Sequence, residues 1–142
     1  MAFIVTGTPG TGKTTFAKKL AKEKRYEYID LNELARMADA IEGKDPNRDA
    51  FIVNEKKLMK ALSAAIKKNP RVVVDGHFSH ELSPKLVEKC YVTKCDLKEL
   101  KKRLEARGYS AAKVKENLDA EIFDTCRIEA LEAGHDVEIV QT

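Results

Sequence analysis

The sequence lacks several features that mark special classes of protein. It has no tryptophan, and its 142 residues include only 7 glycines, 4 prolines and 3 cysteines. So few glycines and prolines exclude collagen-like and low-complexity chains. Three cysteines are too few for the disulfide framework of a small secreted domain, which favours a reducing, cytoplasmic compartment.

Long hydrophobic runs are also missing. The longest, such as residues 2–5 and 72–74, are far shorter than the roughly 18 residues of a membrane span. No basic segment precedes a long apolar stretch at the start, so a secretory signal is not expected. Hydrophobic residues make up 43% and charged residues 35% of the chain, and this length and balance predict one folded domain, residues 1–142, without a membrane segment. The net charge of +3 suits phosphorylated small molecules as well as RNA.

Predicted strands alternate with predicted helices along the chain. Apolar and β-branched runs predict strands at 3–6, 26–29, 71–75, 86–93 and 137–140, and helical spacing predicts helices at 12–24, 31–35, 54–69, 97–107 and 110–134. This alternation is typical of a three-layer α/β/α domain with a parallel five-stranded sheet. Residues 137–140 leave no chain for a following helix, so we expect either a shortened chain or a partner that covers the last strand; otherwise the protein is a monomer.

Three local patterns sharpen these boundaries. Asp96 followed by Glu99 is typical of a capping box. Ser110 is expected to cap a single helix that ends at Gly134, with an apolar stripe of Val114, Leu118, Ile122 and Cys126. Residues 37–53 show no regular pattern and include Gly43 and Pro46, which indicates a mobile excursion from the core.

The segment after the first predicted strand carries the strongest functional signal. Residues 7–14 read G-T-P-G-T-G-K-T, a full match to the phosphate-binding pattern G-x-x-x-x-G-K-[ST] between a strand and a helix. Glycines let successive backbone N–H groups converge on phosphate oxygens, and the helix N-terminus adds a favourable dipole. Lys13 is expected to place its charge on the terminal phosphates, while the Thr14 hydroxyl suits Mg²⁺. We call residues 7–15 the phosphate loop.

The strand at 71–75 ends on Asp75, which is expected to help to organise Mg²⁺, although apolar strands often end on an aspartate with no such role. His77 follows two residues later and could orient a water molecule or an acceptor hydroxyl. The alternative is a structural hydrogen bond from this loop histidine. A zinc site that combines His77 and His80 with Cys90 and Cys95 matches no regular zinc spacing and is disfavoured.

Three arginines are candidates for neutralising charge during phosphoryl transfer. Arg36 ends the short helix before the excursion, and Arg103 and Arg107 lie four residues apart on one helix face. A guanidinium group suits phosphate oxygens because of its planar, permanently charged fork. The alternative for each arginine is a merely solvated surface position.

Several segments together resemble the adenylate kinase isoenzyme 6 family over nearly the whole chain. They are GTPGTGKTT at 7–15, NELAR at 32–36, VVDGH at 73–77, RLEARGYS at 103–110, and EN and EIF at 116–117 and 121–123. The resemblance implies a P-loop NTPase fold of the nucleoside monophosphate kinase type, with a monophosphate-binding excursion at about 31–53 and a small lid at about 103–117. It also implies ATP and Mg²⁺ as cofactor and metal, AMP as phosphoryl acceptor, and a parallel ATPase activity.

The same resemblance implies a role for each candidate residue. The ATP phosphates are expected at Gly7, Pro9, Gly10, Thr11, Gly12, Lys13, Thr14 and Thr15, with Arg103 beside them. Thr14 and Asp75 are expected to hold the metal, and Arg36 to face the AMP phosphate. Lys13, Asp75, His77, Arg103 and Arg107 form the expected catalytic group.

Family members also act in small ribosomal subunit maturation, which implies a ribosomal protein and rRNA as partners.

Two departures from the pattern bear on activity. No arginine follows Gly76, where ordinary adenylate kinases carry one that touches phosphates, and the family's last loop and closing helix are absent after Thr142. We therefore also consider an ATPase assembly factor, a kinase for another small acceptor, and a nucleotide-binding module without turnover.

Overall fold

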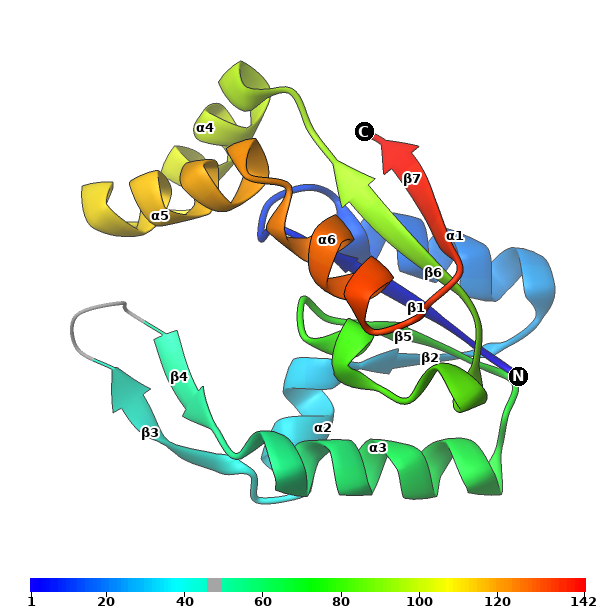
Figure 1. Ribbon diagram of the computed structural model, residues 1–142. Helices are drawn as coiled ribbons and strands as arrows, with labels where there is room; N and C mark the ends of the chain where they lie inside the picture. Colours follow the sequence, from blue (N-terminus) through cyan, green and yellow to red (C-terminus); the bar gives the residue numbers. More distant parts are fainter. Residues whose placement is uncertain (46–49) are drawn as a thin grey trace.

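A computed structural model of the chain describes residues 1–45 and 50–142. Its main sheet has five parallel strands in the order β2-β5-β1-β6-β7, as predicted. The strands are β1 (Ala2–Gly7), β2 (Glu27–Asp30), β5 (Val72–Asp75), β6 (Val87–Lys94) and β7 (Val137–Gln141). β1 lies in the middle of the sheet (Figure 1), so the phosphate loop leaves from the best-supported strand.

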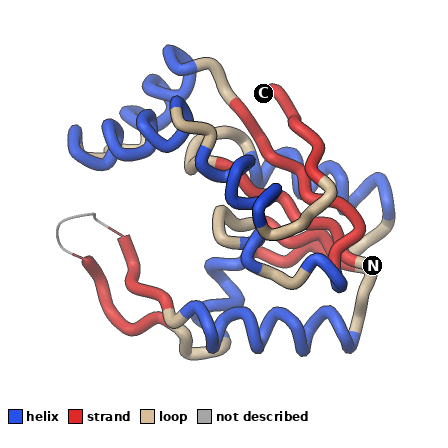
Figure 2. The backbone as a smooth tube through the Cα atoms, viewed as in Figure 1, coloured by secondary structure: helices blue, strands red, loops and turns tan. Residues whose placement is uncertain are grey.

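Helices cover the sheet on both faces (Figure 2). They are α1 (Lys13–Lys24), α2 (Leu31–Met37), α3 (Glu55–Lys68), α4 (Leu97–Ala106), α5 (Ala111–Ile122) and α6 (Thr125–Glu132), with 3-10 turns η1 (Ser79–Glu81) and η2 (Pro84–Leu86). This arrangement confirms the predicted three-layer α/β architecture. No helix among the described residues has the length and apolar character needed to cross a membrane.

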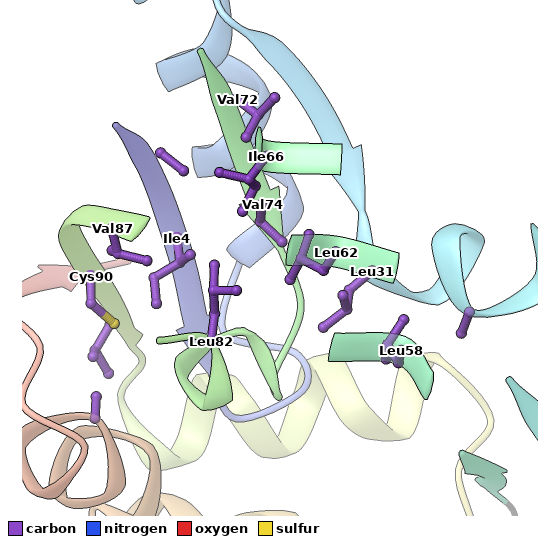
Figure 3. Packing of buried hydrophobic residues seen from close by; sticks show 14 of the residues in the cluster. Ile4, Leu31, Leu58, Leu62, Ile66, Val72, Val74, Leu82, Val87 and Cys90 are labelled. Atoms are coloured by element: carbon purple, nitrogen blue, oxygen red, sulfur yellow. The ribbon is translucent and has the colours of Figure 1, made fainter. Parts of the chain in front are cut away.

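The core is split between the two faces of the sheet. Phe3, Val5 and Val73 point to one face, where they pack against α1, while Ile4 and the neighbouring valines of β5 point to the other. Figure 3 shows this second and larger cluster, which includes Ile4, Leu31, Leu58, Leu62, Ile66, Val72, Val74, Leu82, Val87 and Cys90. Successive residues of β1 and β5 are therefore all buried, which explains why these strands read as continuous apolar runs.

Helix starts follow the expected chemistry in two of three places. Asn54 caps α3 and Ser110 caps α5, each by accepting from a backbone N–H three residues later. The predicted capping box at Asp96 is wrong, because the Asp96 side chain makes no hydrogen bond to the first turn of α4. Asp30, which carried no prediction, caps α2 by accepting from the N–H groups of Asn32 and Glu33.

The prediction of one helix from Ser110 to Gly134 is wrong as well. α5 ends at Ile122, and Asp124 adopts a left-handed conformation (φ 57°) before α6 begins. Ile122, expected in the core, is 57% exposed, whereas its neighbour Glu121 is 7% exposed. The buried position at this turn goes to Glu121 because its carboxylate accepts three hydrogen bonds.

The excursion after α2 contains an antiparallel hairpin that was not predicted. β3 (Ile41–Asp45) pairs with β4 (Ala50–Val53), which exposes Phe51 and Ile52. Pro46 lies outside the described residues, and the expected mobility of the excursion stays a prediction. The hairpin and the α4–α5 pair both extend from the end of the sheet that holds the phosphate loop (Figure 1).

Candidate functional site

The phosphate loop has the tight backbone that its glycines predict. Gly10 and Gly12 have φ of 91° and 88°, a left-handed region that favours glycine. A Cβ on Gly7 would lie 2.4 Å from Thr93 Oγ1, and one on Gly10 would lie 3.0 Å from the Leu100 side chain. The loop therefore fits closely against both β6 and α4, which leaves no space for side chains at these positions.

Buried threonine hydroxyls hold this loop in shape. Thr11 Oγ1 donates to the Thr8 carbonyl over 2.6 Å and lies 2.7 Å from Thr93 Oγ1. Thr93 in turn donates to the Thr6 carbonyl over 3.3 Å. Sequence reasoning missed Thr93, since a threonine at a strand end has no distinctive signal before the sheet order is known.

Lys13 lies at the start of α1, with its Nζ 3.4 Å from the Thr8 carbonyl. Burial lowers the pKa of Lys13 to about 8, and the nearby Asp75 carboxylate opposes this shift. A half-buried ammonium whose charge is poorly solvated gains strongly from an anion placed beside it. Its position suits the terminal phosphates of a nucleotide.

Asp75 ends β5 beside the phosphate loop and is 5% exposed. Its Oδ2 accepts hydrogen bonds from Thr14 Oγ1 over 2.6 Å and from the Tyr28 hydroxyl over 2.7 Å. Burial and this hydrogen bond raise the pKa of Tyr28. A hydroxyl and a carboxylate in direct contact are the oxygen donors that Mg²⁺ prefers, so this pair fits the predicted metal. Tyr28, which positions Asp75, was not predicted.

His77 and His80 have different environments despite their nearness in sequence. His77 is exposed, and its ring lies against Phe78 with centroids 3.9 Å apart and the two planes tilted by 38°. Desolvation of the ring, with the Lys13 charge second, lowers the pKa of His77 and so favours its neutral form. His80 is 2% exposed and is held by Thr6 and Glu129. Neither Cys90 nor Cys95 joins a group of possible metal ligands within the described residues.

Two of the three candidate arginines border a cavity of about 600 Å³ at the phosphate loop. Arg103 Nη1 donates to the Gly10 carbonyl and to Thr142 Oγ1, each over 3.3 Å. Arg107 lies over the Tyr109 ring, with its guanidinium carbon 6.0 Å from the ring centroid. The cavity is lined in part by Gly10, Gly12, Phe16, Arg103, Arg107 and Thr142.

Arg36 lies apart from this cluster. It forms an ion pair with Glu33 on the same helix, and its side chain is 58% exposed. The structure therefore brings Lys13, Thr14, Asp75, Arg103 and Arg107 around the phosphate loop and leaves Arg36 on α2. A smaller cavity of about 210 Å³ lies between the loop and the α5–α6 corner, lined by residues that include Thr8, Pro9, His77, Asn117, Cys126 and Glu129.

Glu121 connects α5 to the phosphate loop, and sequence reasoning gave it no role of its own. Its carboxylate accepts from the Cys95 N–H over 2.9 Å, from Lys94 Nζ over 3.1 Å and from Thr8 Oγ1 over 3.2 Å. Lys94 also donates to Asp124 over 2.9 Å, at the break between α5 and α6. No sequence signal could have located this network, because its members come from three separate segments.

Comparison with known proteins decides the family. Residues 4–124 match the AAA domain family. The chain is 37% identical over 130 residues to a Methanocaldococcus jannaschii protein named "Putative adenylate kinase", covering 92% of this chain and 72% of that protein. It is 38% identical over 131 residues to "Adenylate kinase isoenzyme 6 homolog FAP7" of Saccharomyces cerevisiae, covering 92% and 66% respectively. The chain belongs to the adenylate kinase isoenzyme 6 family.

Solved structures agree with this fold. The YorR protein of Bacillus subtilis, in complex with phosphorylated GDP, aligns with a TM-score of 0.64 at 21% identity, covering 99% of this chain and 85% of that one. A shikimate kinase from Bacteroides thetaiotaomicron aligns with a TM-score of 0.58 at 15% identity, covering 99% and 85%. At these identities the similarity shows the fold alone, which is that of P-loop kinases.

Proposed function

We propose that this member of the adenylate kinase isoenzyme 6 family transfers the γ-phosphate of ATP to AMP, in a Mg²⁺-dependent reaction that forms two ADP. The observation that carries the proposal is the convergence of the Lys13 ammonium, the Thr14 hydroxyl and the Asp75 carboxylate at the phosphate loop. Phosphoryl transfer needs little covalent chemistry from a protein and depends on positioning and charge stabilisation. These three groups supply both requirements.

The ATP side of the site uses the phosphate loop and α4. Backbone N–H groups of the phosphate loop, which Pro9 lacks, bind the phosphate oxygens, and Lys13 places its charge on the terminal phosphates. Arg103 and Arg107 border the 600 Å³ cavity, where they can bind the nucleotide and stabilise charge on its phosphates. Residues 103–117, which run from the end of α4 into α5, act as the lid in this proposal.

Thr14 and Asp75 would hold the Mg²⁺. The ion, when bound, neutralises charge on the β- and γ-phosphate oxygens. Tyr28 keeps Asp75 in place through its hydrogen bond to Oδ2. Because Asp75 is buried and already accepts two hydrogen bonds, its carboxylate is positioned before any nucleotide binds.

The AMP side uses residues 31–53, and Arg36 is the proposed contact to the AMP phosphate. In this structure Arg36 pairs with Glu33 on the surface of α2. An incoming phosphate would compete with Glu33 for the guanidinium group, since both are oxygen anions. The proposed acceptor site is therefore completed when Arg36 exchanges Glu33 for the AMP phosphate.

The proposal is tested by mixing the purified protein with ATP, AMP and Mg²⁺ and measuring ADP. We expect ADP formation in excess of the sample without AMP, and a loss of this excess when Mg²⁺ is chelated. Formation of ADP at the same rate with and without AMP would refute AMP as the acceptor. Replacing AMP by other small hydroxyl acceptors then tests the kinase alternative.

A parallel ATPase activity is favoured by His77. Its imidazole borders the 210 Å³ cavity with Thr8, and in the neutral form favoured by its lowered pKa it can orient a water molecule by accepting a hydrogen bond from it. We expect His77→Ala to reduce ATP hydrolysis without AMP while calorimetry still shows ATP binding. Lys85→Ala, at an exposed position in the following turn, is the matched control. Unchanged hydrolysis in His77→Ala would contradict a role of His77 in the ATPase activity. If the wild type left ATP undiminished in long incubations, a nucleotide-binding module without turnover would be favoured.

The proposed setting is small ribosomal subunit maturation, with a ribosomal protein and rRNA as partners. Support comes from the family resemblance and from the sheet edge at β7, where Ile139 is 44% exposed and could be covered by a partner. Sedimentation of the protein with purified small subunits, with and without ATP, tests this setting. Co-sedimentation that changes with nucleotide supports it, and its absence in both conditions opposes it.

A further inference from the structure

One cluster outside the nucleotide site brings together three potential metal ligands. His80 and Glu81 lie on η1, and Glu129 lies on α6. His80 Nε2 is 2.7 Å from Glu129 Oε2 and 3.8 Å from Glu81 Oε1, and the three atoms lie within 4.8 Å of one another. We propose that His80, Glu81 and Glu129 bind one divalent cation of the zinc type, independently of the proposed nucleotide chemistry.

The proposal depends on which atoms around the His80 ring donate hydrogen bonds. The Thr6 hydroxyl has one hydrogen, and it donates to the His77 carbonyl over 3.0 Å. Thr6 Oγ1 also lies 2.8 Å from His80 Nδ1, and while the Thr6 hydrogen points to the His77 carbonyl, this contact is made by an N–H on Nδ1. In a neutral imidazole Nε2 then carries a lone pair, which faces the Glu129 carboxylate. The 2.7 Å approach of Nε2 to this carboxylate therefore requires a positive charge between the two atoms, which is a metal ion in this proposal and a second ring proton otherwise.

The second observation is the way His80 is fixed. Its side chain is 2% exposed, Thr6 holds its Nδ1, and His135 Nε2 contacts its backbone carbonyl at 2.8 Å. Metal-bound histidines characteristically have their other ring nitrogen held by a hydrogen bond of this kind. The Nε2 atom is thus aimed at two carboxylates from a buried, preorganised ring.

The geometry suits a small ion after a modest adjustment. Tetrahedral zinc with bonds of about 2.0–2.1 Å has ligand atoms about 3.3 Å apart. The separations from Nε2 to the two carboxylates lie on either side of that value. Glu81 and Glu129 have about half of their side-chain surface exposed, so both can move slightly. The 210 Å³ cavity borders His80 and Glu129 and can supply water as a further ligand. Imidazole favours zinc over magnesium.

The experiment uses the full chain without nucleotide, titrated with Zn²⁺ in a buffer that contains excess Mg²⁺. We expect one zinc site by calorimetry, weakened at least tenfold in Glu129→Gln and in Glu81→Gln. Glu132→Gln, an exposed position three residues further along α6, is the matched control and should bind zinc like the wild type. Both glutamines replace partly exposed carboxylates, and circular dichroism in chelator confirms that each variant folds.

A second measurement identifies the nitrogen ligand. The ¹⁵N resonance of His80 Nε2 should shift on zinc addition in the wild type, and in Glu129→Gln the same shift should need at least tenfold more zinc. The proposal is overturned if the wild type binds no zinc, if the two glutamate variants bind as well as the wild type, or if Glu132→Gln loses binding equally. A His80 ring that carries protons on both nitrogens and ignores zinc also overturns it, because a proton then takes the place of the metal.

Discussion

The two sides of the proposed active site are built differently. The phosphate loop is held by buried hydroxyls, by Asp75 and by Glu121, and its glycines pack against β6 and α4. The acceptor side consists of the short helix α2 and the β3–β4 hairpin, where Arg36 and Phe51 are both more than half exposed. The phosphate loop is therefore preorganised by its surroundings, whereas the acceptor side is largely exposed to solvent.

This difference matters for catalysis. Groups that are fixed before the reaction cost no reorganisation when charge develops in the transition state, so the phosphate loop can contribute fully. In the proposed reaction Arg36 must first leave its ion pair with Glu33 to bind a phosphate, so the contribution of the acceptor side includes that rearrangement. Substitutions on the two sides should consequently have different kinetic signatures.

The largest effect is expected at Lys13. Lys13→Ala removes the charge that we propose faces the terminal phosphates, and we expect turnover to fall by more than tenfold, as for other preorganised groups that stabilise a transition state. The measurement is ADP formation at saturating ATP. Lys22→Ala, an exposed position on the same helix, should retain wild-type turnover. Near-normal turnover in Lys13→Ala would show that the preorganised phosphate side does not use the Lys13 charge for the reaction.

Glu121 tests whether the phosphate side owes its rigidity to buried contacts. Glu121→Ala leaves the Cys95 N–H, the Lys94 ammonium and the Thr8 hydroxyl without their shared acceptor. The free energy of unfolding should fall by about 2–4 kcal/mol, measured by urea denaturation. The control is Glu105→Ala on the exposed surface of α4, where the change should stay within about 0.5 kcal/mol. Equal stability of the two variants would contradict the structural role of Glu121.

Arg36 tests the open side. Arg36→Ala should raise the KM for AMP by about tenfold, corresponding to the loss of one charge-assisted hydrogen bond of about 1.4 kcal/mol. The KM for ATP should remain unchanged, since Arg36 lies on α2 away from the 600 Å³ cavity. Arg103→Ala should give the opposite pattern. If Arg36→Ala raised the KM for AMP and the KM for ATP by the same factor, the two sides of the site would not be functionally separate.

The smallest expected effect is the uptake of a proton by Lys13 when nucleotide binds. The pKa of Lys13 is lowered to about 8, so between pH 8 and its unfolded value of 10.5 the folded, nucleotide-free protein loses this proton while the unfolded chain retains it. A bound triphosphate favours the ammonium form, so nucleotide binding at pH 8.5 should take up a substantial fraction of one proton. Calorimetry in buffers of different ionisation enthalpy measures this uptake. Uptake that is equal at pH 6.5 and pH 8.5 would contradict the lowered pKa.

Sequence reasoning located the parts of the site that are local in the chain. The phosphate loop, the strand that ends at Asp75 and the caps at Asn54 and Ser110 depend on neighbouring residues, and the structure confirms these elements. The roles assigned to Lys13, Asp75, His77 and the arginines remain predictions, because they concern ligands.

The parts that sequence reasoning missed depend on distant contacts. The break at Asp124 follows from burial of Glu121 beneath the phosphate loop, and a four-residue apolar spacing cannot reveal that a carboxylate takes the core position. The pairing of Tyr28 with Asp75 requires β2 and β5 to be neighbours, which only the sheet order shows. The β3–β4 hairpin lacks the alternating pattern that marks strands, since both of its faces are largely open.

The central claim is that the phosphate loop and Lys13 hold the triphosphate. It is tested most directly by calorimetric titration of the folded protein with magnesium ATP, beside the Lys13→Ala variant. The account predicts one saturable site in the wild type and binding weakened at least tenfold in the variant. A titration of the wild type that shows no heat and no saturation, or equal binding by both proteins, would contradict it.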